Sequence, residues 1–215
     1  MIVDTHLEDY IEAHGDVEMD YLAKIDRNTH LFTFNPRMLS GHQQGRLLSM
    51  FSKMISPNRI LELGTFTGYS ALCLAEGLSA NGRLHTVESN DELEALIRSN
   101  FALSPYNHQI ELHICGALDF CRQTDEMFDL VFMDADKREY SDYYDALFDK
   151  IRPGGYIIAD NTLWDGKVLE TPHPSDKQTI AIKKFNDMIA QDQRIEKIIL
   201  PLRDGMTIIR KKDRL

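Results

Sequence analysis

The chain has 215 residues, a length that favours a single domain. Hydrophobic residues make up 43% and charged residues 27%, proportions typical of a globular protein that exclude wholesale disorder. The chain has 24 lysines and arginines against 34 aspartates and glutamates. The resulting net charge of −10 argues against binding to nucleic acid or to an anionic membrane surface.

Two further features of the sequence indicate a cytoplasmic protein. No uninterrupted apolar stretch approaches the ~20 residues of a membrane span, and no basic segment followed by an apolar run opens the chain. The three cysteines, Cys73, Cys115 and Cys121, lack CxxC spacing. We therefore expect free thiols in apolar packing, in a reducing compartment, rather than disulfides or a zinc site.

The N-terminal part of the chain predicts helices. Residues 1–35 are acidic with sparse apolar positions, which favours one or two peripheral helices. A clearer helix is predicted over 43–55, with Ser40 or Gly41 at its start. Its apolar positions at helical spacing are Leu47, Leu48, Phe51, Met54 and Ile55.

From Pro57 onward, short β-like runs alternate with helical runs. The predicted strands are 59–63, 84–87, 110–114, 128–133, 156–159, 195–200 and 206–209. The predicted helices are 68–78, one from a possible Ser89/Glu92 capping box to about 103, 118–122, 140–151 and 177–190. Residues 162–176 have no clear period and are interpreted as a functional loop.

This alternation predicts an α/β fold with a mostly parallel sheet covered on both faces. The short Arg203-Asp204-Gly205 connection joins the last two strands and requires them to be antiparallel. We therefore expect one Rossmann-like, doubly wound domain over residues 1–215, with a seven-stranded sheet whose last strand is antiparallel.

A glycine turn follows the first strand, in Glu62-Leu63-Gly64-Thr65-Phe66-Thr67-Gly68-Tyr69-Ser70. Such a turn lets the backbone approach a ligand and offers helix N-terminal amides to an anion. The spacing is GxxxG rather than the GxGxxG of dehydrogenases, which suits a carboxylate better than a pyrophosphate. Glu88 ends the second strand, where an acid can accept hydrogen bonds from ribose hydroxyls. The glycine turn and Glu88 together point to an adenosine-bearing cofactor. The alternatives are a tight structural turn for the glycines and a helix-capping acid for Glu88.

Acidic and amide side chains end the fourth and fifth strands, as Asp134-Ala135-Asp136-Lys137 and Asp160-Asn161. Adjacent parallel strands lie ~4.8 Å apart, so these groups can reach one cation if the fifth strand breaks after Asp160. An all-oxygen set suits Mg²⁺, Mn²⁺ or Ca²⁺ rather than zinc. Beside such a cation the ammonium form of Lys137 is disfavoured, which suits a general base. The alternatives are solvated or helix-capping acids and an ordinary surface lysine.

With these motifs the sequence resembles the cation-dependent class I O-methyltransferases, the family of caffeoyl-coenzyme A and catechol O-methyltransferases. The matching stretches are ILELGTFTGYSALCLA, FDLVFMDADKREYSDYY, GGYIIADNTLWDGKV and LPLRDGMTIIRKK. PRMLSGHQQGRLL resembles the cofactor-closing segment of the family, and together the resemblance covers residues 36–212.

The resemblance implies methyl transfer from S-adenosylmethionine to a hydroxyl of a catechol-like phenolic small molecule, and a homodimer. It implies a divalent cation at Asp134, Asp160 and Asn161, with Lys137 as the candidate base and Trp164 facing the acceptor. His42 and Gln43 receive no role. The implied cofactor-binding residues are Met38, Ser40, Glu62, Gly64, Ser70, Glu88, Ala117, Asp134 and Asp136.

Three other functions compete with this interpretation. A nicotinamide-dependent oxidoreductase is disfavoured by the missing GxGxxG, and a non-catalytic cofactor-binding protein by the complete set of cation ligands. A nucleic-acid methyltransferase is disfavoured by the charge and by the lack of an Asn/Asp-Pro-Pro-aromatic motif.

Overall fold

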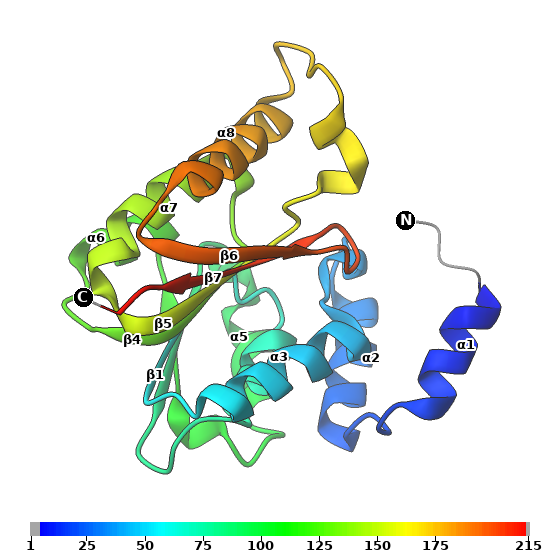
Figure 1. Ribbon diagram of the computed structural model, residues 1–215. Coiled ribbons are helices and arrows are strands. Elements are labelled where there is room, and N and C mark those ends of the chain that lie inside the picture. Colours follow the sequence, from blue (N-terminus) through cyan, green and yellow to red (C-terminus); the bar gives the residue numbers. More distant parts are fainter. Residues whose placement is uncertain (1–4, 214–215) are drawn as a thin grey trace.

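The computed structural model of the chain describes residues 5–213 (Figure 1). The α-helices are α1 (Thr5–His14), α2 (Asp20–Phe32), α3 (Gly41–Ile55), α4 (Tyr69–Ala75), α5 (Glu94–Phe101), α6 (Ala117–Gln123), α7 (Tyr140–Leu147) and α8 (Lys177–Gln191). The strands are β1 (Arg59–Leu63), β2 (Arg83–Glu88), β3 (Ile110–Ile114), β4 (Phe128–Met133), β5 (Ile151–Asp160), β6 (Ile195–Leu200) and β7 (Met206–Lys211). In this part of the chain, none of the helices has the length and apolar character needed to cross a membrane.

The strands form one seven-stranded sheet in the order β3-β2-β1-β4-β5-β7-β6. β1 to β5 pair in parallel, whereas β7 pairs antiparallel with both β5 and β6. The predicted α/β, Rossmann-like, doubly wound fold is confirmed, including the antiparallel last strand.

Each face of the sheet carries its own apolar core, because successive side chains of a strand point to opposite faces. One core packs under α6, α7 and α8 and includes Leu61, Val131 and Ile157. The other packs under α2, α3, α4 and α5 and includes Ile60 and Leu130. The two helical layers lie on either side of the sheet in Figure 1. Apolar residues dominate the central strand β4, as expected for a doubly covered parallel sheet, whereas β2 also buries His85, Thr86 and Glu88.

The N-terminal helices differ in how deeply they are buried. α1 lies at the outer edge of the molecule, away from the sheet (Figure 1). α2 packs on α4 and buries Leu22, Ile25 and Thr29 completely. Two helices thus form in the predicted N-terminal region, and α2 packs one face into the core. Its few apolar residues recur at helical spacing, and that spacing is enough to place one face in the core.

Most of the predicted apolar face of α3 packs on the core. Leu48 is fully buried, and Leu47, Phe51 and Ile55 pack against the core cluster. Met54 is 71% exposed, whereas Ser49 and Ser52 are fully buried. A Cβ on Gly45 would lie 2.7 Å from the Tyr69 ring, so small residues are required where α3 crosses α4. The side chain of Ser40 occupies the N-cap position without making the capping hydrogen bond.

Two further boundaries differ from the prediction. Asn90, rather than Ser89, caps the segment before α5, because its side-chain oxygen accepts a hydrogen bond from the Glu92 amide. α7 ends at Leu147, and Ile151 begins β5 instead of ending the helix. The Pro-Gly-Gly segment after Ile151 forms an irregular stretch within β5, since the pairing with β4 shifts from Phe128↔Ile151 to Leu130↔Tyr156.

Gly64 allows the ends of β1 and β4 to approach each other. It adopts φ +96°, and a Cβ there would lie 2.3 Å from the Asp134 carbonyl oxygen. The Asp134 amide donates to the Leu63 carbonyl at 2.8 Å in the same place. Gly64 is therefore required for the close packing of the β1 and β4 ends, in addition to any role in ligand binding.

We expect Gly64→Ala to lower Tm far more than Gly166→Ala. Gly166 has φ +78°, and a Cβ added there would meet nothing within 4 Å, so its substitution carries only the backbone strain. The added backbone overlap at Gly64 should cost at least ~2 kcal/mol more, which is about 4–8 °C in Tm. Thermal unfolding followed by circular dichroism measures the difference, and equal Tm values for the two variants would contradict this explanation.

Candidate active site

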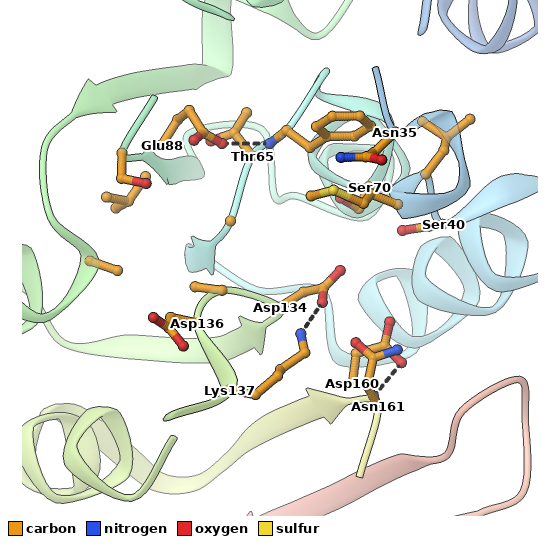
Figure 2. A pocket seen from close by; sticks show the side chains of 18 of the residues that line it. Asn35, Ser40, Thr65, Ser70, Glu88, Asp134, Asp136, Lys137, Asp160 and Asn161 are labelled. Carbon is orange, nitrogen blue, oxygen red and sulfur yellow. Dashed lines mark hydrogen bonds and ion pairs between the residues drawn. The ribbon is translucent and has the colours of Figure 1, made fainter. Parts of the chain in front are cut away.

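A cavity of about 790 Å³ opens at the carboxyl ends of the parallel strands, where ligands bind in open α/β sheets. Figure 2 shows Glu88 and Thr65 on one side of it and Lys137, Asp160 and Asn161 on the other. Every sequence-predicted site residue except Glu62 lines this cavity. These residues are Met38, Ser40, Gly64, Ser70, Glu88, Ala117, Asp134, Asp136, Lys137, Asp160, Asn161 and Trp164.

The turn after β1 and the end of β2 form one wall. The Glu88 carboxylate accepts hydrogen bonds from the Phe66 amide and the Asn90 amide, both at 2.8 Å. These two bonds hold the carboxylate at the cavity edge, and each oxygen keeps a lone pair for a ligand hydroxyl. Phe66 itself adopts φ +50°, an uncommon conformation for a residue with a side chain.

Glu62 is fully buried and does not line the cavity. Burial raises its pKa to about 8, although hydrogen bonds from Ser70 and Thr86 act in the opposite direction. The Thr86 hydroxyl donates to Oε2 at 2.5 Å, and Oε1 has no partner among residues 5–213. Ser70 lines the cavity directly.

The segment after β4 carries Asp134 and Lys137. The Lys137 ammonium donates to Asp134 Oδ1 at 2.5 Å and lies 5.1 Å from the Tyr140 ring centroid. Lys137 is only 7% exposed, which is unusual for a lysine, so the alternative of a solvated surface lysine is wrong. Asp136 pairs with Arg138, which lowers the pKa of Asp136.

The fifth strand breaks where the sequence required it to. β5 ends at Asp160, and Asn161 adopts the left-handed conformation at φ +58°. Both residues consequently line the same cavity. Burial, followed by the nearby charge of Asp134, raises the pKa of Asp160 to about 6.

Two residues that sequence reasoning missed hold Asp160. The Gln44 side chain, buried in α3, donates to Asp160 Oδ2 at 2.6 Å. Arg203, in the β6–β7 turn, donates to Gln44 Oε1 at 3.1 Å and to the Leu39 carbonyl at 3.0 Å. The buried Tyr140 hydroxyl donates to the Asp160 carbonyl at 3.1 Å and to the Met133 carbonyl at 2.9 Å, and so joins the ends of β4 and β5.

The donor set fits a hard divalent cation. Two carboxylates and one amide side chain line the cavity, and Lys137 is paired with one of them, Asp134. Burial is the main cause of the raised pKa of Asp160 and repulsion by Asp134 is the second, and a cation bound by both carboxylates would oppose both effects. Oxygen ligands of this kind suit Mg²⁺, Mn²⁺ or Ca²⁺.

The chain belongs to the O-methyltransferase family, whose sequence model matches residues 12–212. It is 34% identical over 174 residues to mouse catechol O-methyltransferase domain-containing protein 1, which covers 77% of this chain. The chain in turn spans only 65% of the mouse protein. It is 32% identical over 185 residues to caffeoyl-CoA O-methyltransferase 2 of Petunia hybrida, covering 81% of this chain and 76% of that protein.

The solved structure of an O-methyltransferase from Bacillus cereus in complex with SAH superposes with a TM-score of 0.89. The match covers 96% of this chain and 97% of that one, at 27% identity. These findings establish the class predicted from the sequence, an S-adenosylmethionine-dependent O-methyltransferase. They favour that class over a nicotinamide-dependent oxidoreductase.

If Glu88 holds the ribose of the cofactor, Glu88→Ala should weaken binding of S-adenosylmethionine. A hydrogen bond to a charged group contributes about 1.5–3 kcal/mol, so we expect Kd to rise by about 10- to 150-fold. Isothermal titration calorimetry without added metal measures this change. Glu92→Ala, at an exposed acid of the same edge, is the matched control. An unchanged Kd in Glu88→Ala would remove the ribose assignment.

Proposed function

We propose that the protein transfers the methyl group of S-adenosylmethionine to one hydroxyl of a vicinal diphenol, and that the transfer depends on a divalent cation. The observation that carries this proposal is the shared cavity. Asp134, Asp160, Asn161 and Lys137 line the same space as the glycine turn and Glu88. Its volume of about 790 Å³ lies within the ~300–1,000 Å³ range of small-molecule sites.

Asp134, Asp160 and Asn161 would hold the cation. A divalent cation bound there supplies a Lewis acid that orients a vicinal diol and lowers the pKa of its hydroxyls. Gln44 holds the Asp160 carboxylate in place, and Arg203 in turn holds Gln44. The protein's main contribution is therefore to align an acceptor oxygen with the sulfonium methyl group.

Lys137 is the proposed general base. Its amine lies beside Asp134 and is largely shielded from water. In its neutral form this amine can take the proton of the acceptor hydroxyl as the oxygen attacks the methyl carbon. The C–S bond breaks as the C–O bond forms, and the products are the methyl ether, S-adenosylhomocysteine and a proton on Lys137.

Trp164 and the 162–176 segment would shape the acceptor pocket. Trp164 and Asp165 adopt φ +49° and +51°, and Trp164 lines the cavity. The Petunia relative is named for caffeoyl-CoA, whose caffeoyl group carries two adjacent phenolic hydroxyls. That chemistry supports a catechol-like acceptor for this chain as well.

The acceptor class is tested with three related substrates. A simple catechol should be methylated in the presence of Mg²⁺. Its 1,3-diol isomer and its monomethyl ether should react at least about 10²-fold more slowly, because they cannot present two adjacent hydroxyls. Equal kcat/KM for the three compounds, measured by chromatography of the products, would contradict the proposed acceptor class.

The cytoplasmic location, the homodimer and the absence of nucleic-acid and membrane partners stay predictions. The exposed apolar side chains of Met50, Met54, Phe32 and Phe34 on and next to α2 and α3 provide surface for a second copy.

Among the cysteines, Cys73 and Cys121 are buried free thiols as predicted, whereas Cys115 is exposed.

A further inference from the structure

Two histidines and a glutamate meet on the α6 face of the sheet, away from the acidic groups of the cavity. His85 lies on β2, and Glu111 and His113 lie on the edge strand β3. The parallel register places His85 beside Glu111, and His113 follows two residues later on the same face. None of the three lines the active-site cavity.

The donor atoms are spaced for one small cation. His85 Nδ1 lies 3.1 Å from His113 Nε2 and 3.6 Å from Glu111 Oε2. One donor atom from each of the three residues can be chosen so that all three atoms lie within 4.8 Å of one another. Ligands ~2.0–2.1 Å from a tetrahedral zinc ion stand about 3.4 Å apart, so the observed spacings need only small adjustments.

The residue types of the cluster also favour a metal, since each offers a donor atom to the same point. Glu111 is half-exposed, and its other oxygen, Oε1, lies 3.8 Å from Arg83 Nε. Two imidazoles and one carboxylate form a ligand set that zinc uses with a fourth position open to water.

We propose that His85, Glu111 and His113 bind a zinc-class transition-metal ion, separate from the hard cation of the active site. The His113 ring packs on Phe120 of α6 with ring centroids 4.6 Å apart. An ion at this cluster therefore fastens edge strand β3 to β2 beneath α6. Its role is structural, and it stabilises the folded protein by mass action.

The test compares zinc binding in four proteins, each in saturating Mg²⁺ to occupy the active site. These are the wild type, His113→Gln, Glu111→Gln and the control His108→Gln, an exposed histidine that precedes β3. Calorimetry should give one zinc equivalent for the wild type and the control. We expect at least about tenfold weaker binding in the other two variants. At a zinc concentration about 100 times Kd, Tm should rise by about 5–10 °C in the wild type and the control only.

Two results would overturn the proposal. One is zinc affinity in His113→Gln and Glu111→Gln equal to that of the wild type. The other is zinc binding that disappears in Asp160→Asn, which would place the ion in the active site. The replacements lie outside the cavity, so Mg²⁺-dependent methyl transfer should persist in both, and their folding is checked by circular dichroism in chelator. Zinc binding is measured without a methyl acceptor, so the zinc proposal can fail or succeed whether or not a catechol is the acceptor.

Discussion

Chelation of divalent cations should reduce methyl transfer by at least about 10²-fold, since a Lewis acid contributes several kcal/mol and each 1.36 kcal/mol is tenfold in rate. Mg²⁺ or Mn²⁺ added after removal of the chelator should restore the rate. Binding of S-adenosylmethionine should survive chelation, because the glycine turn and Glu88 require no cation. Initial rates and calorimetry with and without EDTA separate the two effects.

Asp160→Asn is the matched variant for this prediction. It keeps the size of a side chain that is 4% exposed but removes one of the two carboxylates. We expect its activity to need far more Mg²⁺ than the wild type and its affinity for S-adenosylmethionine to stay the same. Because chelator also strips the proposed zinc site, Mg²⁺ alone must restore activity. Full activity in chelator, with no metal found by elemental analysis, would show that Asp134 and Asp160 have a structural role and bind no catalytic cation.

Lys137→Ala should lower kcat by ~10²–10⁴-fold, the usual contribution of a general base, with a smaller effect on acceptor binding. The loss should shrink as the pH rises, because hydroxide then removes the acceptor proton without the lysine. Steady-state kinetics from about pH 6.5 to about pH 9.5 measure this dependence. Lys184→Ala, at an exposed lysine of α8, is the control.

Lys137→Arg separates proton transfer from charge. Arginine keeps the positive charge beside Asp134 but cannot give up its proton near neutral pH. We therefore expect the arginine variant to remain slow, like the alanine variant. A wild-type rate in Lys137→Arg across the whole pH range would show that the residue acts through its charge alone.

Local sequence patterns predicted the strands well. The bounds of β1, β3 and β4 agree with the predicted ranges to the residue, because turn or polar residues flank each of these short runs. Most of the predicted apolar face of α3 also packs on the core, and Met54 is the exception. Hydrophobic periodicity assumes, however, that every buried position is apolar. At the crossing with α4, close approach requires Gly45, Ser49 and Ser52 instead.

Contacts between segments far apart in the chain could not be predicted from the sequence. Arg203 and Gln44 are 159 positions apart, and only the fold brings them together behind Asp160. The His85–His113 pair likewise depends on the register between β2 and β3. The family resemblance implied a cofactor-binding role for Glu62, which is fully buried and does not line the cavity. By contrast, parallel-strand geometry alone brought Asp134 and Asp160 to one edge of the sheet.

The central claim is methyl transfer to an oxygen of a vicinal diphenol, and the fate of a labelled methyl group tests it most directly. The protein is incubated with Mg²⁺, a catechol and S-adenosylmethionine carrying a ¹³C methyl group, and the products are followed by NMR. We predict an aryl methyl ether signal that grows in step with S-adenosylhomocysteine, and no such signal with Asp160→Asn at the same Mg²⁺ concentration. A label that stays on the cofactor with every vicinal diphenol offered, or that appears on carbon or nitrogen, would contradict the account.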